Sequence, residues 1–239
     1  MSGPVLLNNV DHADLKVVLD RGARYGDAVN QAPVFATEFE ALQREYAIVF
    51  RRDPAGVFRA TVLLGFESGE NLYLDGDRWD ARTIPAVMSR GPFSIGTPAP
   101  GEAGEPMIHI DPDHPRVSRE HGAEIFKPHG GNSAYLDSVA EVLQRIYVGS
   151  QAEGAIFAAF ATHGLIEPVT LDVEIGDGRR YTVPDCHTIS LERLAALDGA
   201  ALADLNARDM LRLAIWVRSS LGNIPALAER KLRRDAGTP

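Results

Sequence analysis

The chain has 239 residues, 45% of them hydrophobic and 24% charged, which is enough for one large globular domain or two small ones. Its 33 acidic and 24 basic residues give a net charge of −9. This balance argues against general nucleic-acid binding, because neutralising phosphates requires clustered Lys and Arg. The single cysteine, Cys186, excludes an internal disulfide framework.

The N-terminal segment MSGPVLLNNVDHADLK lacks a basic region followed by an apolar stretch of about 7–15 residues, so it does not resemble a secretory signal. No uninterrupted apolar run approaches the ~20 residues that span a bilayer. We therefore expect a protein of the cytoplasm that does not insert into a membrane.

The first half of the chain predicts a short helix and an antiparallel meander. Thr37 followed by Glu40 forms a capping-box pattern for a helix that reaches Tyr46. Apolar residues 47–50 and 58–66 flank the turn formers of residues 51–56, which predicts a hairpin, with a third strand at residues 71–74.

A short helix should follow from Pro85 to Arg90, because proline favours the first helical position. Strands are then expected at residues 93–95 and 107–111, with a surface loop rich in Pro, Gly and Glu between them at residues 97–106. Residues 109–129 are polar and irregular, with four histidines and three prolines, and form the best candidate for a functional loop.

The second half predicts mainly helices. Asn132 or Ser133 can cap an amphipathic helix, and a second helix should begin at Gln151 and stop at Gly164. A second hairpin is expected from residues 169–175 and 179–183. The chain then turns helical from Ser190 onward.

These elements predict an α+β fold: a mainly antiparallel sheet with packed helices and a helical C-terminal tail. We expect a single domain, with an α+β core at residues 1–189 and the tail at residues 190–239. The tail should pack back on the core through four large apolar side chains: Leu211, Leu213, Ile215 and Trp216.

Several stretches together resemble one bacterial protein family. They are TEFEALQREYAIVF, ATVLLGFESGENLYLDGDRW and IPAVMSRGPF between Thr37 and Phe93, with His12, MIHIDPDHPRVS, HGLIEPVTLDVEIGDGRRYTV and SSLGNIPAL. Their arrangement resembles the SapC family over nearly the whole chain. The resemblance implies a surface-layer association by name, and gene neighbourhoods that often include flavin-dependent tryptophan halogenases and outer-membrane receptors. It implies no reaction and no catalytic residue set.

Large apolar side chains gather in sequence within this family-like block, close to two arginines. They have two interpretations: packing in the core, or an apolar pocket for an aromatic or peptide-like ligand whose carboxylate meets the arginines. The residues concerned are Tyr73, Trp79, Met88 and Phe93, with Arg82 and Arg90.

A possible metal site is His109-Ile-Asp111, because residues two apart on a strand share a face. With a distant histidine, His187 or alternatively His163, this pair could form an iron-binding facial triad. The simpler interpretation is that Asp111 caps the turn at residues 112–113 while His109 is half-buried beside the sheet.

Weaker chemical candidates occur elsewhere. Three other histidines, His114, His121 and His129, match no compact zinc pattern. Cys186 and His187 are neighbours on an expected strand, so their side chains should point to opposite faces and not touch. No phosphate-binding loop and no Gly-x-Ser-x-Gly elbow is present in the sequence. A catalytic role for His12 has no support beyond its presence.

Four basic residues, Arg230, Lys231, Arg233 and Arg234, crowd the C-terminus and are interpreted as complementing the helix dipole at a solvated end. The function favoured by the sequence is that of a non-enzymatic accessory protein of the bacterial cytoplasm, which binds a protein partner or a small aromatic or peptide-like ligand and needs no cofactor. The alternative is an Fe(II)-dependent oxidoreductase that uses His109, Asp111 and His187.

Overall fold

A five-stranded antiparallel sheet forms the centre of the larger part of the molecule. In the computed structural model, which describes residues 3–96, 105–176 and 178–237, the strands follow the order β12-β13-β4-β5-β3. Their bounds are Gln31–Pro33 for β3, Ile48–Arg52 for β4, Phe58–Leu63 for β5, Ile166–Glu174 for β12 and Arg180–Ile189 for β13. Both predicted hairpins, β4–β5 and β12–β13, are confirmed.

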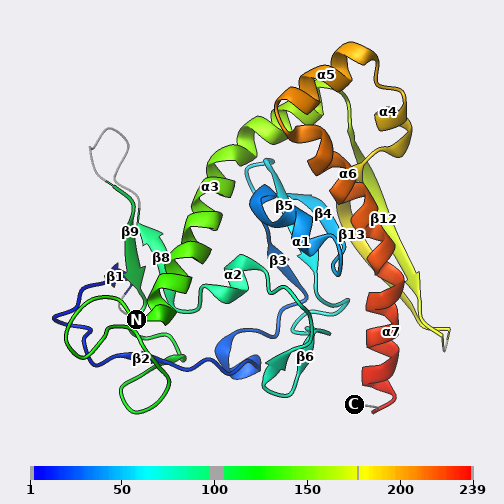
Figure 1. The fold of residues 1–239 in the computed structure, drawn as a ribbon. Helices are drawn as coiled ribbons and strands as arrows, with labels where there is room; N and C mark the ends of the chain where they lie inside the picture. Colours follow the sequence, from blue (N-terminus) through cyan, green and yellow to red (C-terminus); the bar gives the residue numbers. More distant parts are fainter. Residues whose placement is uncertain (1–2, 97–104, 177, 238–239) are drawn as a thin grey trace.

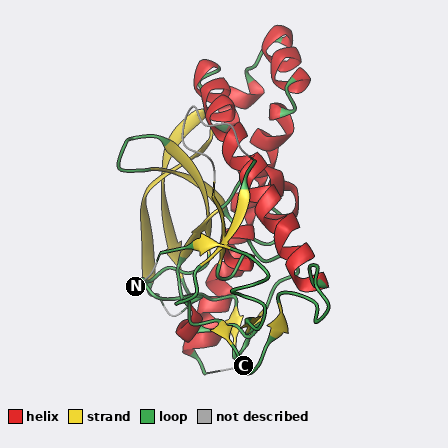
Figure 2. Ribbon diagram, turned by 90° about the vertical axis from the view of Figure 1, so that its left-hand side faces the viewer, coloured by secondary structure: helices red, strands yellow, loops and turns green. Residues whose placement is uncertain are grey.

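Helices cover this sheet, and the α+β class is confirmed. Most of them stand on one side of the strands in the side view (Figure 2). They are the turn η2 (Ala36–Glu38), α1 (Phe39–Leu42), α4 (Leu191–Ala195), α5 (Gly199–Ala207), α6 (Met210–Ser220), the turn η3 (Leu221–Asn223) and α7 (Ile224–Asp235).

Short strands build the smaller part, which lies at the lower left of Figure 1. One sheet has the order β1-β9-β8 and a second has the order β10-β2-β11, whereas β6 pairs with β7 in a third sheet that packs on the larger core. The bounds are Val5–Leu6 (β1), Lys16–Val17 (β2), Leu74–Asp75 (β6), Arg78–Trp79 (β7), Phe93–Gly96 (β8), Met107–Ile110 (β9), Val117–Ser118 (β10) and Ala123–Glu124 (β11), with the turn η1 (Ala23–Tyr25) and the helix α2 (Ala86–Ser89) beside them.

One long helix, α3 (Ala134–Thr162), joins the two parts of the molecule (Figure 1). Ser133 caps it, since its hydroxyl accepts the Leu136 N–H at 3.1 Å. The sequence predicted two helices here, and that prediction is wrong: α3 runs without a break for 29 residues. Gly149, which resembles a helix break, is buried at a point where η2 approaches α3 closely.

Two groups of buried apolar side chains stabilise the fold. The larger group lies between the five-stranded sheet and the helices, where Phe157 packs edge-on against Phe50 with ring centroids 4.9 Å apart. The smaller group lies between α3 and the β1-β9-β8 sheet and includes Phe93 and Leu143. Because α3 contributes to both groups, it fixes the small sheets relative to the large one.

The tail packs on the core as expected, but not through all of the expected side chains. Helix α6 contacts β4, β13 and α1, and Ser220 on α6 accepts the Ile48 N–H at 2.9 Å. Leu213 is buried and Leu211 and Trp216 are partly buried, whereas Ile215 is 48% exposed. The inclusion of Ile215 was wrong, because the buried face of α6 continues through Ala214 and Val217. The core and tail boundary at residue 189 stays a prediction.

Two local predictions in the first half were also wrong. Glu38 replaces Glu40 as the capping residue: its carboxylate accepts the Phe35 N–H at 3.0 Å and the Ala86 N–H at 2.8 Å. Thr37 instead donates its hydroxyl to the Arg145 carbonyl at 3.0 Å, on α3. Residues 71–74 do not extend the meander, because the edge beside β5 is taken by β3.

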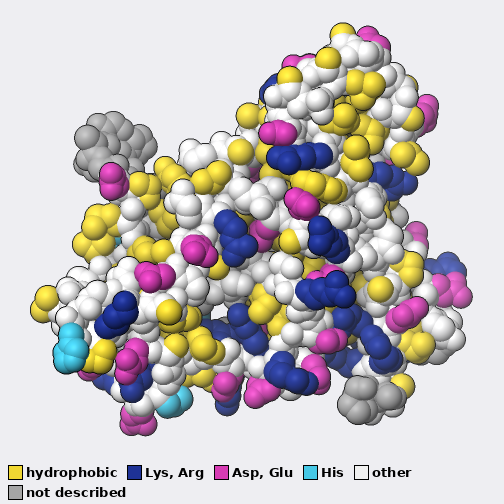
Figure 3. Space-filling model, in the orientation of Figure 1, with side chains coloured by type: hydrophobic (Ala, Val, Ile, Leu, Met, Phe, Trp, Pro, Cys, Tyr) yellow, Lys and Arg dark blue, Asp and Glu magenta, His cyan; other side chains and the backbone are white. Residues whose placement is uncertain are grey.

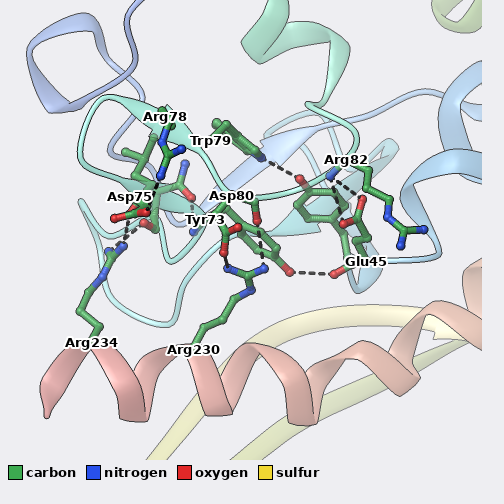
Figure 4. A network of polar contacts seen from close by, with 12 residues as sticks. Glu45, Tyr73, Asp75, Arg78, Trp79, Asp80, Arg82, Arg230 and Arg234 are labelled. Atoms are coloured by element: carbon green, nitrogen blue, oxygen red, sulfur yellow. Dashed lines mark hydrogen bonds and ion pairs between the residues drawn. The ribbon is translucent and has the colours of Figure 1, made fainter. Parts of the chain in front are cut away.

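The basic end of α7 attaches this helix to residues 67–80. Lys231 is buried and donates to Glu67 at 2.5 Å and to Glu70 at 2.7 Å. Burial alone would lower the pKa of Lys231, but these carboxylates raise it above its usual value. Arg230 and Arg234 bind the same segment (Figure 4), so these side chains do more than complement the helix dipole.

None of the described helices combines the length and the apolar character needed to cross a bilayer.

The crossing of η2 and α3 predicts opposite effects for two glycines of the same helix. A Cβ on Gly149 would lie 2.4 Å from the Phe35 Cβ, whereas a Cβ on Gly154 meets nothing within 4 Å. We expect Gly149→Ala to lower the free energy of unfolding by about 1–3 kcal/mol through overpacking. The matched control, Gly154→Ala, should raise it by about 0.5–1 kcal/mol, because alanine favours helix.

Urea unfolding of the two variants measures both effects. Equal effects of the two substitutions would contradict this account of the helix crossing.

Candidate functional site

The predicted aromatic pocket is not formed around Tyr73 and Trp79. Both side chains belong to the larger core: Tyr73 is 2% exposed and donates its hydroxyl to the Glu45 carbonyl at 2.8 Å, and Trp79 Nε1 donates to the Tyr46 hydroxyl at 2.7 Å. Arg82 lies beside Glu45, but its guanidinium points away from the two rings (Figure 4). The core interpretation of these aromatic residues therefore fits the structure.

Arg90 and Phe93 lie in the smaller part of the molecule, and Met88 packs on the larger core. Phe93 is fully buried, and Arg90 donates to its carbonyl oxygen at 2.5 Å. The five expected ligand-binding residues thus divide between the two cores, with Tyr73, Trp79 and Arg82 on one side and Arg90 and Phe93 on the other. The structure does not bring them together into one pocket.

The three expected iron ligands are also kept apart. His109 is on β9 and His187 is on β13, in different sheets, and among the described residues no group of three His, Cys, Asp or Glu side chains could hold a metal ion. His109 lies against Gly96, where a Cβ would come within 2.0 Å of its ring, and Asp111 accepts the Asp113 N–H at 3.1 Å. His109 is thus half-buried beside the sheet and Asp111 caps the turn at residues 112–113, as in the simpler interpretation.

His187 and Cys186 show no partnership either. The His187 ring packs edge-on against Phe58 at 4.9 Å, and burial lowers its pKa. Cys186 is buried, which raises the pKa of its thiol and disfavours the reactive thiolate.

A different group of charged side chains lies between α2, the start of α3 and the N-terminal segment. Its centre is a buried ion pair, in which Arg116 Nη2 donates to Asp27 Oδ2 at 2.5 Å and each side chain is 4% exposed. The chain forms a tight turn to place Asp27, because Asp27 Oδ2 also accepts the Gly22 N–H at 2.8 Å. Gly22 has φ 142°, a conformation that favours glycine.

The rest of the Arg116 side chain holds the N-terminal segment in place. Its Nη1 donates to the carbonyl oxygens of Val18, at 3.1 Å, and of Asp20. The guanidinium also stacks over the Tyr25 ring with its carbon 4.6 Å from the centroid. Arg116 is thus fully engaged by the fold, and its charge is compensated by Asp27.

Arg21 is the second guanidinium beside Asp27, and it is more loosely held. Its Nη1 lies 3.7 Å from Asp27 Oδ1 and donates to the Met88 carbonyl at 2.7 Å. Burial lowers the pKa of Arg21, and Asp27 opposes that shift. Its Nε and Nη2 have no hydrogen-bond partner in the described part of the chain.

A cavity of about 180 Å³ opens against these groups. The space-filling view shows a hollow between α2 and the N-terminal segment, bordered by Lys and Arg side chains (Figure 3). We call it the arginine pocket; it is lined by Val17, Val18, Leu19, Arg21, Ser89, Gly91, Arg116 and Tyr135.

The ionised side chains at the pocket have a net charge of +1. Arg21 and Arg116 contribute two guanidinium groups, and Asp27 is the one carboxylate that contacts them. Tyr135 adds a phenol whose oxygen has no hydrogen-bond partner among the described residues. Burial raises the pKa of Tyr135 to about 12, so its hydroxyl keeps its proton and remains a donor at neutral pH.

Sequence reasoning missed this pocket because its members come from four segments that share no motif. The one available signal was the irregular segment 109–129, chosen as the candidate functional loop, which supplies Arg116. Arg90 lies between two pocket residues in sequence, but its guanidinium binds the Phe93 carbonyl.

Comparison with known families gives the evolutionary context. The SapC family model matches residues 7–227. The chain belongs to the SapC family. No curated protein and no solved structure matches the chain.

The SapC match contains every residue of the arginine pocket, and it ends before the basic residues of α7. The expected family membership is therefore confirmed, and the pocket lies within the matched residues.

His114 beside the SapC-family pocket predicts a pH effect on stability. Its Nδ1 accepts the Arg116 N–H at 3.1 Å, and burial followed by the charge of Arg116 lowers its pKa below the usual 6.5. As pH falls below about 6.5, His114 binds a proton in the unfolded chain before it does so in the folded chain. Proton binding therefore favours the unfolded chain, and the free energy of unfolding falls. In His114→Asn, which retains an acceptor, this decrease should be absent.

Urea unfolding at pH 7.5 and 5.5 provides the check, with His121→Asn at an exposed histidine as the control. The stability advantage of the native chain over His114→Asn should be smaller at pH 5.5. The same advantage at both pH values would refute the effect.

Proposed function

We propose that this SapC-family chain is a non-enzymatic binding protein whose arginine pocket holds a small molecule by its carboxylate group. The observation that carries the proposal is the guanidinium of Arg21, which lines a cavity and shares the single carboxylate of Asp27 with Arg116. A bound carboxylate would give this half-buried charge a second anionic partner.

The available donors suit a carboxylate. Arg21 offers Nε and one Nη, the edge of the guanidinium that forms two parallel hydrogen bonds with a carboxylate. The Tyr135 hydroxyl lines the same cavity and provides a further donor. Such charge-assisted hydrogen bonds contribute about 1.5–3 kcal/mol each.

The remaining wall is apolar and sets the size of the ligand. Val17, Val18 and Leu19 line one side of the cavity. A volume of about 180 Å³ is several times the roughly 30 Å³ that a water molecule occupies in the liquid. These features favour a ligand with a carboxylate attached to a small apolar or aromatic group. The ligand class is the one expected from the sequence, but the residues proposed to bind it are different.

Binding without catalysis follows from the chemistry of the lining groups. Guanidinium stays protonated at neutral pH, and burial raises the pKa of Tyr135 to about 12. Neither group accepts a proton readily from a bound substrate, whereas both donate hydrogen bonds. We further propose that the chain acts as an accessory protein in the bacterial cytoplasm, as expected from the sequence.

Calorimetric titration with matched ligands tests the proposal. Benzoate should bind, and benzamide, which has the same ring without the charge, should bind at least tenfold more weakly. Arg21→Gln should weaken benzoate binding by about 10–100-fold, the equivalent of one lost charge-assisted hydrogen bond. Tyr135→Phe should weaken it by a smaller factor, because a neutral donor is lost.

Arg24→Gln is the matched control, because Arg24 is three residues away and its side chain is 68% exposed in a pair with Asp20. Its benzoate affinity should equal that of the native chain. Equal binding of benzoate and benzamide, or an unchanged affinity in a folded Arg21→Gln variant, would rule out the arginine pocket as a carboxylate site.

A further inference from the structure

A second cavity lies beside β10 and the N-terminal segment and has no residue in common with the arginine pocket. Its volume is about 340 Å³, and it is lined by Asp11, His12, Leu15, Pro112, Val117, Ser118 and Arg119. We call it the histidine pocket. His12 is 9% exposed and is the one buried titratable side chain among these residues.

The fold determines which nitrogen of His12 remains available to a ligand. His12 Nδ1 accepts the Asn8 N–H at 3.1 Å, so a neutral imidazole carries its hydrogen on Nε2. Nε2 has no partner among the described residues, and it is not among the enclosed polar atoms. Because His12 lines the cavity, its Nε2–H is a donor that a ligand in the cavity could use.

Ser118 provides a second donor at the same wall. Its hydroxyl oxygen accepts the Glu120 N–H at 3.1 Å and the His121 N–H at 3.3 Å, so these backbone groups fix its position. Its own hydrogen has no acceptor among the described residues. Both residues line the cavity, so the wall offers two donors that have no acceptor among the described residues.

The charges at the rim oppose an anionic ligand. Asp11 carries a carboxylate of which one oxygen accepts Asn8 Nδ2 at 2.9 Å, and Arg119 is already paired with Asp14. The charges of Asp11, Arg119 and Asp14 sum to −1. A group that accepts from His12 and Ser118 and donates to Asp11 matches this wall better than a phosphate or a carboxylate.

We propose that the histidine pocket binds an amide group of a peptide-like ligand. The ligand carbonyl accepts from His12 Nε2 and the Ser118 hydroxyl, and its N–H donates to the free Asp11 oxygen. The apolar side chains of Leu15 and Val117 contact the rest of the ligand. This site does not depend on the carboxylate proposal, because the two pockets have different residues.

The test is a titration with the diamide N-acetylglycine N-methylamide as the probe. Binding is measured by NMR, as chemical-shift changes of the His12 ring and of the Ser118 and Arg119 backbone amides. Methyl acetoxyacetate, an ester, is the matched comparison, since it retains both carbonyl groups of the diamide but has an ester oxygen in place of each N–H. Inorganic phosphate tests the anionic alternative. We expect saturable shifts with the diamide, weaker binding of the ester, and no saturable shift with phosphate.

His12→Asn is the informative variant, because its side-chain oxygen can replace Nδ1 toward Asn8 while the Nε2 donor is lost. It should bind the diamide at least tenfold more weakly, and His129→Asn, at an exposed histidine outside the pocket, should bind it normally. Unchanged diamide binding in His12→Asn, no saturable shift in the native chain, or saturation by phosphate would overturn the proposal.

Asp11→Asn decides the matter if His12→Asn does not fold, because Asp11 is exposed and its replacement retains an acceptor for Asn8. Loss of the preference for the diamide over the ester in this variant supports the proposal. An unchanged preference contradicts it.

Discussion

The buried pair of Arg116 and Asp27 is the interaction on which the smaller part of the molecule depends. Through the carbonyl oxygens of Val18 and Asp20, Arg116 attaches the N-terminal segment to the loop that precedes β10. Removing one member of a buried pair leaves an uncompensated charge, at a cost of about 3–5 kcal/mol. Replacing both members with apolar residues is often neutral, so the pair is better explained by what it positions than by net stability.

What it positions is Arg21. The Asp27 carboxylate lies 2.5 Å from Arg116 and 3.7 Å from Arg21, so its electrostatic interaction with Arg116 is the stronger one. Arg21 is therefore held at a cavity wall by the fold while retaining charge and donors for a ligand. The histidine pocket is built in the same way, since a backbone contact at Nδ1 of His12 leaves Nε2 available. In both pockets a polar side chain that lines the cavity is fixed by one contact with the chain and retains nitrogen atoms without a partner among the described residues.

Local patterns explain why the hairpins and the cap at Ser133 were predictable: alternation, turn formers and capping residues act over a few positions. Predictions failed where a distant segment decides. Gly149 resembles a helix break, but it admits η2 against α3, and the position beside β5 is taken by residues 31–33 and not by residues 71–74. The two pockets were not predictable for the same reason. Their residues follow no regular spacing in the sequence, and the different contacts of Arg21 and Arg116 with Asp27 are set by distant segments.

Double-mutant cycles with Asp27→Asn, measured as free energies of unfolding, test most directly whether Asp27 is paired mainly with Arg116 and only weakly with Arg21. For the cycle of Asp27→Asn and Arg116→Met, we expect a coupling energy of about 2–3 kcal/mol, because each single substitution leaves a buried charge unpaired. For the cycle with Arg21→Met, we expect a coupling energy below about 1 kcal/mol. Equal coupling energies for the two arginines, or a larger value for Arg21, would contradict the account.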